Sequence, residues 1–369
     1  MFVMKPENGH RRFTSYWERA PSRPLSIGLS LLSLGYRSLY LTREALFASG
    51  VLRTQSLPVP VIGVGNLTVG GTGKTPAVEL VARTLQDLGR KPAIVSRGYG
   101  RTSRGIVVAS DGVRLLATPE EAGDEPYLLA RRLPNLPIVV GRHRYRAGKL
   151  CVDRFRPDAL VLDDSFQHRT LKKDLEILLI NGQSPWGNGH LFPRGPLREP
   201  FSSVKRASML VITRPPRDGA LRSLVAEIRL YHPDVLILTA DYEASRPVRA
   251  DGSAEGYDGR PLLAFCGIAD PESFRRSLAE SGVKLLDVVH FPDHHWYGED
   301  ELSDLGEAAR ERGAAGLVTT EKDQMRIARF GRGPLPLFIL PVRLRLLTDE
   351  KLWRDRLATL ASHMKHEVA

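Results

Sequence analysis

The chain has very little cysteine. Its 369 residues include only Cys151 and Cys266, which lie far apart and form no Cys-x-x-Cys pair. A disulfide framework needs more cysteines, and a thiolate metal site needs them closely spaced. The sequence therefore excludes both kinds of site and fits a reducing compartment best.

Long apolar runs are also missing. The best candidate for membrane contact is 26–47, and its charges leave it short of the roughly 20 apolar residues that a bilayer needs. Wound as a helix, it places its leucines and aromatics around most of the circumference, with Arg43 as an exception that can snorkel. The narrow polar stripe between them consists of Ser26, Ser30, Ser33, Arg37 and Glu44. The pattern favours a helix lying in a membrane interface, with a helix packed on the protein's own core and a secretory signal as alternatives.

Acidic residues are outnumbered. Lysine and arginine total 53 against 42 aspartates and glutamates, which gives a net charge of +11. This balance predicts an acidic partner, for which a nucleic acid, an anionic membrane and a phosphorylated substrate are the three candidates. Because no RNA-binding motif accompanies the basic residues, nucleic acid is not the expected partner.

What the chain does contain is a glycine-rich loop directly after an apolar strand, within 59–76. Backbone N–H groups in such a loop converge on phosphate oxygens, while Lys74 reaches the β- and γ-phosphates and Thr75 holds Mg²⁺. Thr68 stands where both the triphosphate loop and the dinucleotide fingerprint want glycine, but only the former requires Gly73-Lys74-Thr75. The sequence predicts an ATP and Mg²⁺ site, and its expected nucleotide-binding residues are Gly70, Gly71, Thr72, Gly73, Lys74 and Thr75.

Apolar strands alternating with helical patterns predict an α/β fold: a P-loop NTPase-like, doubly wound, mostly parallel sheet, a second, smaller α/β domain and an N-terminal membrane-associated helix. Leu337–Leu344 is expected as a returning edge strand because of Pro341. The expected divisions are a docking segment 1–53, a kinase core 54–239, a linker 240–260, the smaller domain 261–345 and a C-terminal helix and tail 346–369.

Carboxylates follow two of these elements. Asp163 and Asp164 end an apolar strand, where a P-loop enzyme places an aspartate near Mg²⁺. Asp124 and Glu125 begin a helical stretch, where they either stabilise the helix N-terminus or orient a hydroxyl nucleophile and accept its proton.

Histidines gather in 290–297, where Pro292 breaks the helical spacing that a metal pair would need. A hydrogen-bonding or proton-relay histidine is the main expectation, and a structural histidine or a metal site are the alternatives. Arginines are concentrated in 96–101, 141–146 and 193–199, and their planar forks suit phosphate. Thr320–Asp323 does not fit a guanine signature because Lys322 and Asp323 are adjacent.

Several motifs, in order along nearly the whole chain, resemble the tetraacyldisaccharide 4'-kinase family of lipid A synthesis. They are 65–76, Ser96-Arg97-Gly98-Tyr99, Gly123-Asp124-Glu125-Pro126, Asp163-Asp164-Ser165-Phe166-Gln167-His168, Gly187-Asn188-Gly189-His190, Gly195-Pro196-Leu197-Arg198-Glu199, Asp293-His294 and Thr320-Glu321-Lys322-Asp323. The family has serine or threonine at the position of Thr68. Ser165 departs from the glycine expected there and adds only a hydroxyl.

The resemblance implies transfer of the ATP γ-phosphate to the 4'-hydroxyl of a tetraacylated disaccharide 1-phosphate, at the cytoplasmic face of a Gram-negative inner membrane. It implies that Lys74 binds phosphate and that Asp124 is the catalytic base, paired with His294, although His295 remains open for that role. The implied metal residues are Thr75, Asp163, Asp164 and Glu125. The expected substrate-binding residues are Asn66, Arg97, Tyr99, Arg142, Gln167, His168 and Arg198.

Two other functions are compatible with the loop alone. One is a soluble P-loop kinase for a small phosphorylated metabolite, with the helix at 26–47 packed internally. The other is an ATP-binding scaffold that switches partners without transferring phosphate. The sequence does not predict the oligomeric state or the acyl-chain preference.

Overall fold

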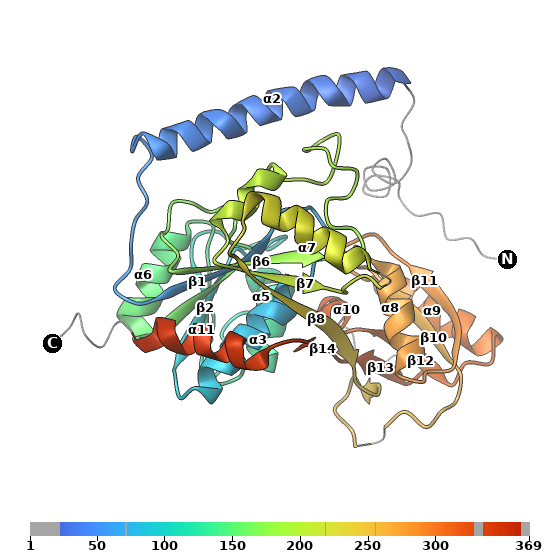
Figure 1. Ribbon diagram of the computed structural model, residues 1–369. Coiled ribbons are helices and arrows are strands. Elements are labelled where there is room, and N and C mark those ends of the chain that lie inside the picture. Colours follow the sequence, from blue (N-terminus) through green and yellow to red (C-terminus); the bar gives the residue numbers. More distant parts are fainter. Residues whose placement is uncertain (1–22, 71, 218, 255, 328–334, 363–369) are drawn as a thin grey trace. The chain divides into compact units, whose positions relative to one another are not determined.

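The computed structural model describes residues 23–70, 72–217, 219–254, 256–327 and 335–362 (Figure 1). Its described residues divide into two compact units. The larger unit contains those up to Asp241 and those from Leu344 onward, and the smaller contains Tyr242 to Arg343.

A nine-stranded sheet forms the centre of the larger unit, in the order β14-β8-β7-β6-β1-β5-β2-β4-β3. The strands from β8 to β4 pair in parallel with their neighbours, whereas the edge strand β3 runs antiparallel to β4. Their bounds are β1 Val61–Asn66, β2 Pro92–Ser96, β3 Val107–Asp111, β4 Pro137–Val140, β5 Ala159–Asp163, β6 Leu175–Asn181, β7 Met209–Thr213, β8 Leu236–Ala244 and β14 Val342–Leu346. The central strands β1, β2, β5 and β7 are buried along their whole length, which explains their continuous apolar sequences.

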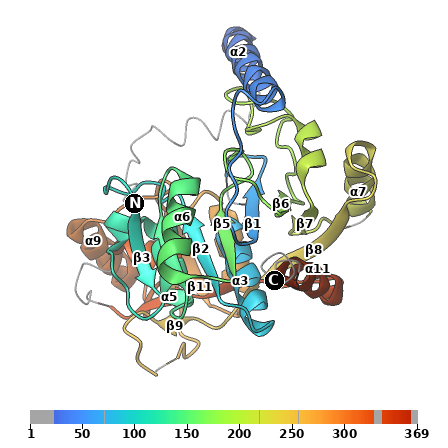
Figure 2. The same ribbon diagram turned by 90° about the vertical axis from the view of Figure 1, so that its left-hand side faces the viewer.

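Helices cover both faces of this sheet, as right-handed crossovers require (Figure 1). Helices α3, α5 and α11 lie on one face, and α6 and α7 lie on the other (Figure 2). The helices of this unit are α2 Arg23–Ala48, α3 Lys74–Asp87, α4 Pro119–Ala122, α5 Asp124–Arg132, α6 Arg144–Phe155, the 3-10 turn η1 Phe201–Arg206, α7 Ala220–Tyr231 and α11 Glu350–Ser362.

The smaller unit has its own five-stranded sheet in the order β11-β10-β12-β13-β9, with only β9 antiparallel to its neighbour. Its elements are β9 Val248–Arg249, β10 Leu262–Cys266, α8 Pro271–Glu280, β11 Leu285–His290, α9 Glu299–Glu311, β12 Gly316–Thr320, α10 Glu321–Ile327 and β13 Leu337–Leu340. Residues 240–260, expected as a linker, include the end of β8 and the whole of β9.

The predicted fold class is confirmed. The main difference concerns 337–344, which was expected as one strand and forms parts of two. β13 belongs to the smaller sheet and β14 to the larger one, with Pro341 between them. Proline lacks an N–H donor and so interrupts a ladder, which allows the chain to change sheets here.

Helix α2 is amphipathic in an inverted sense. Its inner face combines part of the predicted polar stripe with other polar residues. Ser33 of that stripe donates to the carbonyl of Leu191 at 2.9 Å, and the hydroxyl of Tyr36 donates to that of Arg198 at 2.7 Å, whereas Arg37 of the stripe is exposed. Arg43 donates to the carbonyl of Gln167. Its outward face carries exposed apolar side chains: Leu25, Ile27, Leu31, Leu32, Leu34, Leu39 and Leu41.

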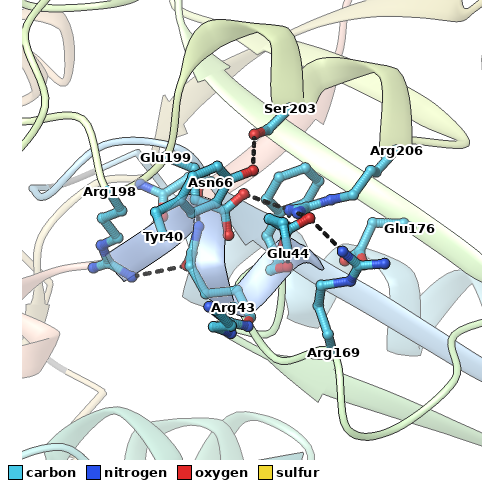
Figure 3. A network of polar contacts seen from close by, with 12 residues as sticks. Tyr40, Arg43, Glu44, Asn66, Arg169, Glu176, Arg198, Glu199, Ser203 and Arg206 are labelled. Carbon is cyan, nitrogen blue, oxygen red and sulfur yellow. Dashed lines mark hydrogen bonds and ion pairs between the residues drawn. The ribbon is translucent and has the colours of Figure 1, made fainter. Parts of the chain in front are cut away.

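The inner face of α2 ends in a network of charges (Figure 3). Tyr40 hydrogen-bonds Ser203 at 2.9 Å, and Glu44 pairs with Arg169 and with Arg206, the latter at 3.6 Å. Polar contacts therefore hold the helix, and its leucines are left for another partner. Within the described chain, no helix is both long and apolar enough to cross a bilayer.

The packing of α11 on α3 gives a stability prediction. Trp353 is buried and donates from its indole to Thr84 Oγ1 at 2.9 Å. We expect Trp353→Ala to lower the free energy of unfolding by about 3–5 kcal/mol through the cavity it leaves, and Trp353→Phe by about 1 kcal/mol through the lost hydrogen bond. Urea unfolding measures both. Leu352→Ala, at a position 43% exposed on the same helix, should change little, and an equal loss there would contradict the assignment.

Candidate active site

The glycine-rich loop connects β1 to α3 with the backbone that glycine permits. Gly70 has φ 119° and Gly73, the N-cap of α3, has φ 80°, both in the region that other residues rarely adopt. Lys74 and Thr75 therefore form the first turn of α3, where N–H groups are unpaired and point toward an anion. The predicted residue Gly71 lies outside the described residues.

Asn66 joins the loop to its lysine. Its side-chain amide donates to the carbonyl of Thr68 at 2.7 Å, and its Oδ1 accepts from Lys74 Nζ at 3.2 Å. Lys74 Nζ also lies 3.6 Å from Asp164. The lysine is thus already extended along the loop, held by one amide and one carboxylate.

The segment 187–199 supports the loop from outside the sheet. The N–H of Val69 donates to the carbonyl of Pro196 at 2.8 Å, and the N–H of Arg198 donates to that of Leu67 at 2.7 Å. Thr68, buried at this point, forms an antiparallel bridge with Leu197. Thr68 therefore lies where the loop pairs with a neighbouring segment. A side chain fits at this position, so the glycine of the standard motif is not needed there.

Asp163 and Asp164 lie at the carboxyl end of β5, beside the loop. Asp163 is buried, and its Oδ2 accepts from Ser96 at the end of β2 at 2.8 Å. Asp164 has φ 48° and accepts from Arg198 Nη1 with both oxygens, at 2.9 and 3.1 Å. The two carboxylates thus point to different partners although they are adjacent in sequence.

Gln167 and His168 follow in the same turn. Gln167 donates to the carbonyl of Asn66 at 2.9 Å and accepts from Arg198 at 3.4 Å, so it connects the loop to the Asp164 pair. His168 hydrogen-bonds Thr170 at 2.8 Å, and burial followed by nearby positive charges, of which Arg144 is the foremost, lowers the pKa of its ring to about 4. His168 is therefore neutral at pH 7.

The electrostatics of the two aspartates differ. Burial, and then the carboxylates of Glu125 and Asp164, raise the pKa of Asp163 to about 6. Burial also raises the pKa of Asp164, but Lys74 and Arg198 outweigh it, so this carboxyl titrates below its usual value. Of the two aspartates, Asp163 is the one whose ionised form is disfavoured by its surroundings.

The donor set fits Mg²⁺. The buried Oδ1 of Asp163 has no hydrogen-bond partner among the described residues, and the same holds for Oγ1 of Thr72 in the loop. Oxygen ligands are what Mg²⁺ prefers, and a cation there relieves the repulsion among Asp163, Asp164 and Glu125. Among the described residues, no group of three or more His, Cys, Asp or Glu side chains could hold a metal ion without further ligands such as hydroxyl or phosphate oxygens.

Arg144 is the residue that the sequence analysis did not single out. It starts α6, is buried, and donates to the carbonyls of Gly141 at 2.8 Å and Asp163 at 3.1 Å. Burial lowers the pKa of its guanidinium to about 10. Its position in the arginine-rich stretch 141–146 was visible, but only the fold distinguishes it from the exposed Arg142.

Asp124 begins α5 and is buried. Its Oδ1 accepts from the N–H of Glu125 at 2.9 Å, and Gly123 before it has φ 93°. A Cβ on Gly98 would meet the carbonyl of Ala122 at 2.6 Å, so the loop after β2 packs directly against this turn. Arg97 and Tyr99 of that loop are exposed, as is Arg142.

The histidines of the segment 290–297 lie in the smaller unit. His295 Nε2 pairs with Glu301 at 2.9 Å, and its ring stacks on Phe291 with 4.9 Å between centroids. His294 has φ 61°, and its ring contacts Arg326 Nη2 through Nδ1 at 3.3 Å. Both histidines thus lie near a carboxylate of their own unit, since His294 Nε2 is 3.9 Å from Asp293 Oδ2.

A doubly wound parallel sheet whose first strand runs into a phosphate-binding loop, with two aspartates at the adjacent strand end, defines a P-loop phosphotransferase. Comparison with known proteins then identifies its kind. The profile of the Tetraacyldisaccharide-1-P 4'-kinase family matches residues 25–361, and the chain belongs to this family.

Relatives and a solved structure agree with this membership. A tetraacyldisaccharide 4'-kinase of Syntrophus aciditrophicus (strain SB) is 36% identical over 360 residues, covering 92% of this chain and 95% of that protein. One from Geobacter metallireducens is 43% identical over 306 residues, covering 81% and 88%. The crystal structure of the "apo" form of LpxK from Aquifex aeolicus in complex with ATP matches with a TM-score of 0.71 at 32% identity, covering 92% of this chain and 99% of that one.

These findings confirm the predicted enzyme class, an ATP-dependent 4'-kinase of the lipid A precursor. They favour it over a soluble metabolite kinase and over a non-catalytic scaffold. The roles of the individual site residues remain predictions.

The raised pKa of Asp163 predicts how stability depends on pH. Since the folded value of about 6 exceeds the ordinary 3.8, the metal-free protein should lose stability as pH rises from about 4 through about 6. Asp163→Asn keeps an acceptor for Ser96 but cannot ionise. It should remove this loss and stabilise the metal-free protein at pH 8 by up to about 3 kcal/mol.

Thermal unfolding of both proteins at pH 4 and pH 8, with and without Mg²⁺, measures this effect. Mg²⁺ should stabilise the wild type more than Asp163→Asn. Asp153→Asn, at an exposed carboxylate paired with Lys149 at 3.2 Å, is the matched control and should behave like the wild type. Identical pH profiles for wild type and Asp163→Asn would contradict the assignment.

Proposed function

We propose that the protein transfers the γ-phosphate of ATP to the 4'-hydroxyl of a tetraacylated glucosamine disaccharide 1-phosphate, working from the surface of an anionic membrane. The observation that carries the proposal is the arrangement of Lys74, Asp164 and Arg198 around the phosphate loop in a chain of the 4'-kinase family. Phosphoryl transfer needs mainly positioning and charge stabilisation, which such a set supplies.

ATP binds with its phosphates at the start of α3. The N–H groups of the first turn, together with Gly70 and Gly73, surround the phosphates, and Lys74 neutralises the β- and γ-oxygens. The ATP complex of the Aquifex aeolicus protein supports this placement, because that chain shares the fold at 32% identity.

Thr75, Asp163, Asp164 and Glu125 are the residues that would hold Mg²⁺, which would supply neutralisation of the charge on the phosphoryl group. The residues themselves are prepared for it: the partnerless Oδ1 of Asp163 supplies an acceptor, and the bond from Ser96 fixes the other oxygen.

Asp124 accepts the proton of the acceptor hydroxyl as its oxygen attacks the γ-phosphate. The carboxylate is buried at the N-terminus of α5, where it accepts from the N–H of Glu125, and this keeps it oriented. His294 is the residue that the family resemblance pairs with this carboxylate. The substrate's sugar and phosphate groups are contacted by seven side chains of the larger unit: Asn66, Arg97, Tyr99, Arg142, Gln167, His168 and Arg198.

The lipid acceptor explains the inverted face of α2. Extracting four acyl chains from a bilayer costs roughly 0.8 kcal/mol for each CH₂, so the enzyme has to reach the headgroups where they are. The exposed leucines of α2 enter the interface while the polar inner face stays on the enzyme. The net charge of +11 adds attraction to anionic lipids.

The chemistry is tested with ATP labelled on its γ-phosphate and the tetraacyldisaccharide 1-phosphate in mixed micelles. Wild type should place the label on the glycolipid. Asp124→Asn should lower turnover about 100-fold or more while ATP binding, measured by calorimetry, stays nearly unchanged. Lys74→Ala should weaken ATP binding itself. Full turnover by Asp124→Asn would remove that residue from the role of base.

Membrane docking is tested by vesicle flotation. Leu31, Leu32 and Leu39 are 66%, 62% and 73% exposed. Replacing all three by serine should weaken binding to anionic vesicles about 100-fold, at about 1 kcal/mol for each leucine partly inserted. Leu230→Ser on α7, where the leucine is 80% exposed, is the control and should float as the wild type does. Equal flotation of the triple variant would overturn α2 as the docking element.

A further inference from the structure

The motif Thr320–Asp323 has no role in the chemistry described so far. It joins β12 to α10, and its aspartate is fully buried. Asp323 accepts from three donors of its own unit: the N–H of Gly267 at 3.0 Å, the hydroxyl of Tyr297 at 2.9 Å and that of Thr320 at 2.6 Å. A carboxylate held this way cannot turn to another partner.

Arg326, one turn further along α10, is the fourth donor to Asp323. Its Nη1 lies 3.1 Å from Asp323 Oδ1 and 2.7 Å from the carbonyl of Gly267, and its side chain is as buried as that of Asp323. A buried ion pair contributes little net stability compared with apolar packing. What the pair does supply is a guanidinium in one fixed position.

The other amino group of that guanidinium contacts His294. Arg326 Nη2 lies 3.3 Å from His294 Nδ1, while the N–H of His294 donates to the carbonyl of Gly267 at 3.1 Å. Gly267 is closely packed here, because a Cβ on it would lie 2.9 Å from the carbonyl of Pro292. The backbone of His294 therefore shares the carbonyl of Gly267 with Arg326, and its ring contacts the same arginine directly.

Arginine fixes the protonation pattern of this ring. Its guanidinium is protonated throughout and has only donors, so the contact requires Nδ1 of His294 to be the acceptor. In a neutral imidazole the proton then resides on Nε2.

We infer that Arg326 is a positioning residue that holds His294 as the tautomer with its proton on Nε2. The motif Thr320–Asp323 in turn holds the side chain of Arg326 in place. The inference rests on the proposed role of His294 as partner of Asp124. A ring with hydrogen on Nε2 has its donor on the side where the carboxylate of Asp293 lies, 3.9 Å from that nitrogen. The same ring cannot act as a base through Nδ1.

The tautomer is measurable in the full chain without any activity assay. Nitrogen-15 labelling of the ten histidines, with the His294 signals assigned by their loss in His294→Gln, reports which ring nitrogen carries hydrogen. Above the midpoint of the ring's own titration, the wild type should show hydrogen on Nε2. Hydrogen on Nδ1, or an even mixture of the two tautomers, would overturn the inference.

Variants then test the cause. Arg326→Met alone leaves a buried carboxylate without its counter-charge, so the double variant Asp323→Asn with Arg326→Met is the better-folding form. It should populate both tautomers and lower kcat about 10- to 100-fold, with the KM for ATP unchanged. Arg326→Lys keeps a donor and should retain part of the wild-type tautomer bias. An unchanged tautomer in the double variant would overturn the role of Arg326.

A matched control exists in the same unit. Arg312 pairs with Asp287 at 2.9 Å on the exposed surface, so Arg312→Met should leave both the tautomer and kcat at wild-type values. His294→Gln separates this inference from the proposed function. If that variant keeps full turnover, the catalytic role of His294 fails, whereas the tautomer measured in the wild type stands or falls independently.

Discussion

The parallel pairing of β1 with β5 is the constraint on which the site depends. Val64 lies opposite Asp163 in this register, so the strand that leads into the phosphate loop ends beside the strand that carries the two aspartates. Parallel neighbours end at the same edge of a sheet, and their following turns must meet there. Lys74 and Asp164 come together because two apolar strands are in register, and Arg198 joins them because its segment pairs with the loop.

That edge concentrates charge of both signs in a mostly buried space. Burial and neighbouring carboxylates oppose the ionisation of Asp163, whereas the positive charges of Lys74 and Arg198 stabilise the ionised form of Asp164. Two adjacent residues of one kind therefore have different tasks. Asp164 is paired within the protein, whereas Oδ1 of Asp163 has no hydrogen-bond partner among the described residues.

Sequence patterns predicted what depends on local order. The glycine loop, the alternation of strand and helix and the aspartates at a strand end are properties of short segments, and the fold class followed from them. Arg144 was not singled out, because nothing in the stretch 141–146 tells a buried arginine from an exposed one. The split of 337–344 between two sheets was missed too, since pairing partners far apart in the sequence decide it. The contact between His294 and Arg326 could not be predicted from the sequence for the same reason.

Three of the contacts that attach helix α2 are made to main-chain carbonyls. Ser33, Tyr36 and Arg43 donate to the backbone oxygens of Leu191, Arg198 and Gln167. A carbonyl is present whatever residue occupies a position, so substitutions on the core side leave these acceptors in place, whereas a lost donor on α2 cannot be replaced from the other side. Evolutionary drift at these three contacts should thus be asymmetric, with variation tolerated on the acceptor side and restricted at the donors on α2. Arg169, Ser203 and Arg206 contact Glu44 and Tyr40 through their side chains and should vary together with them.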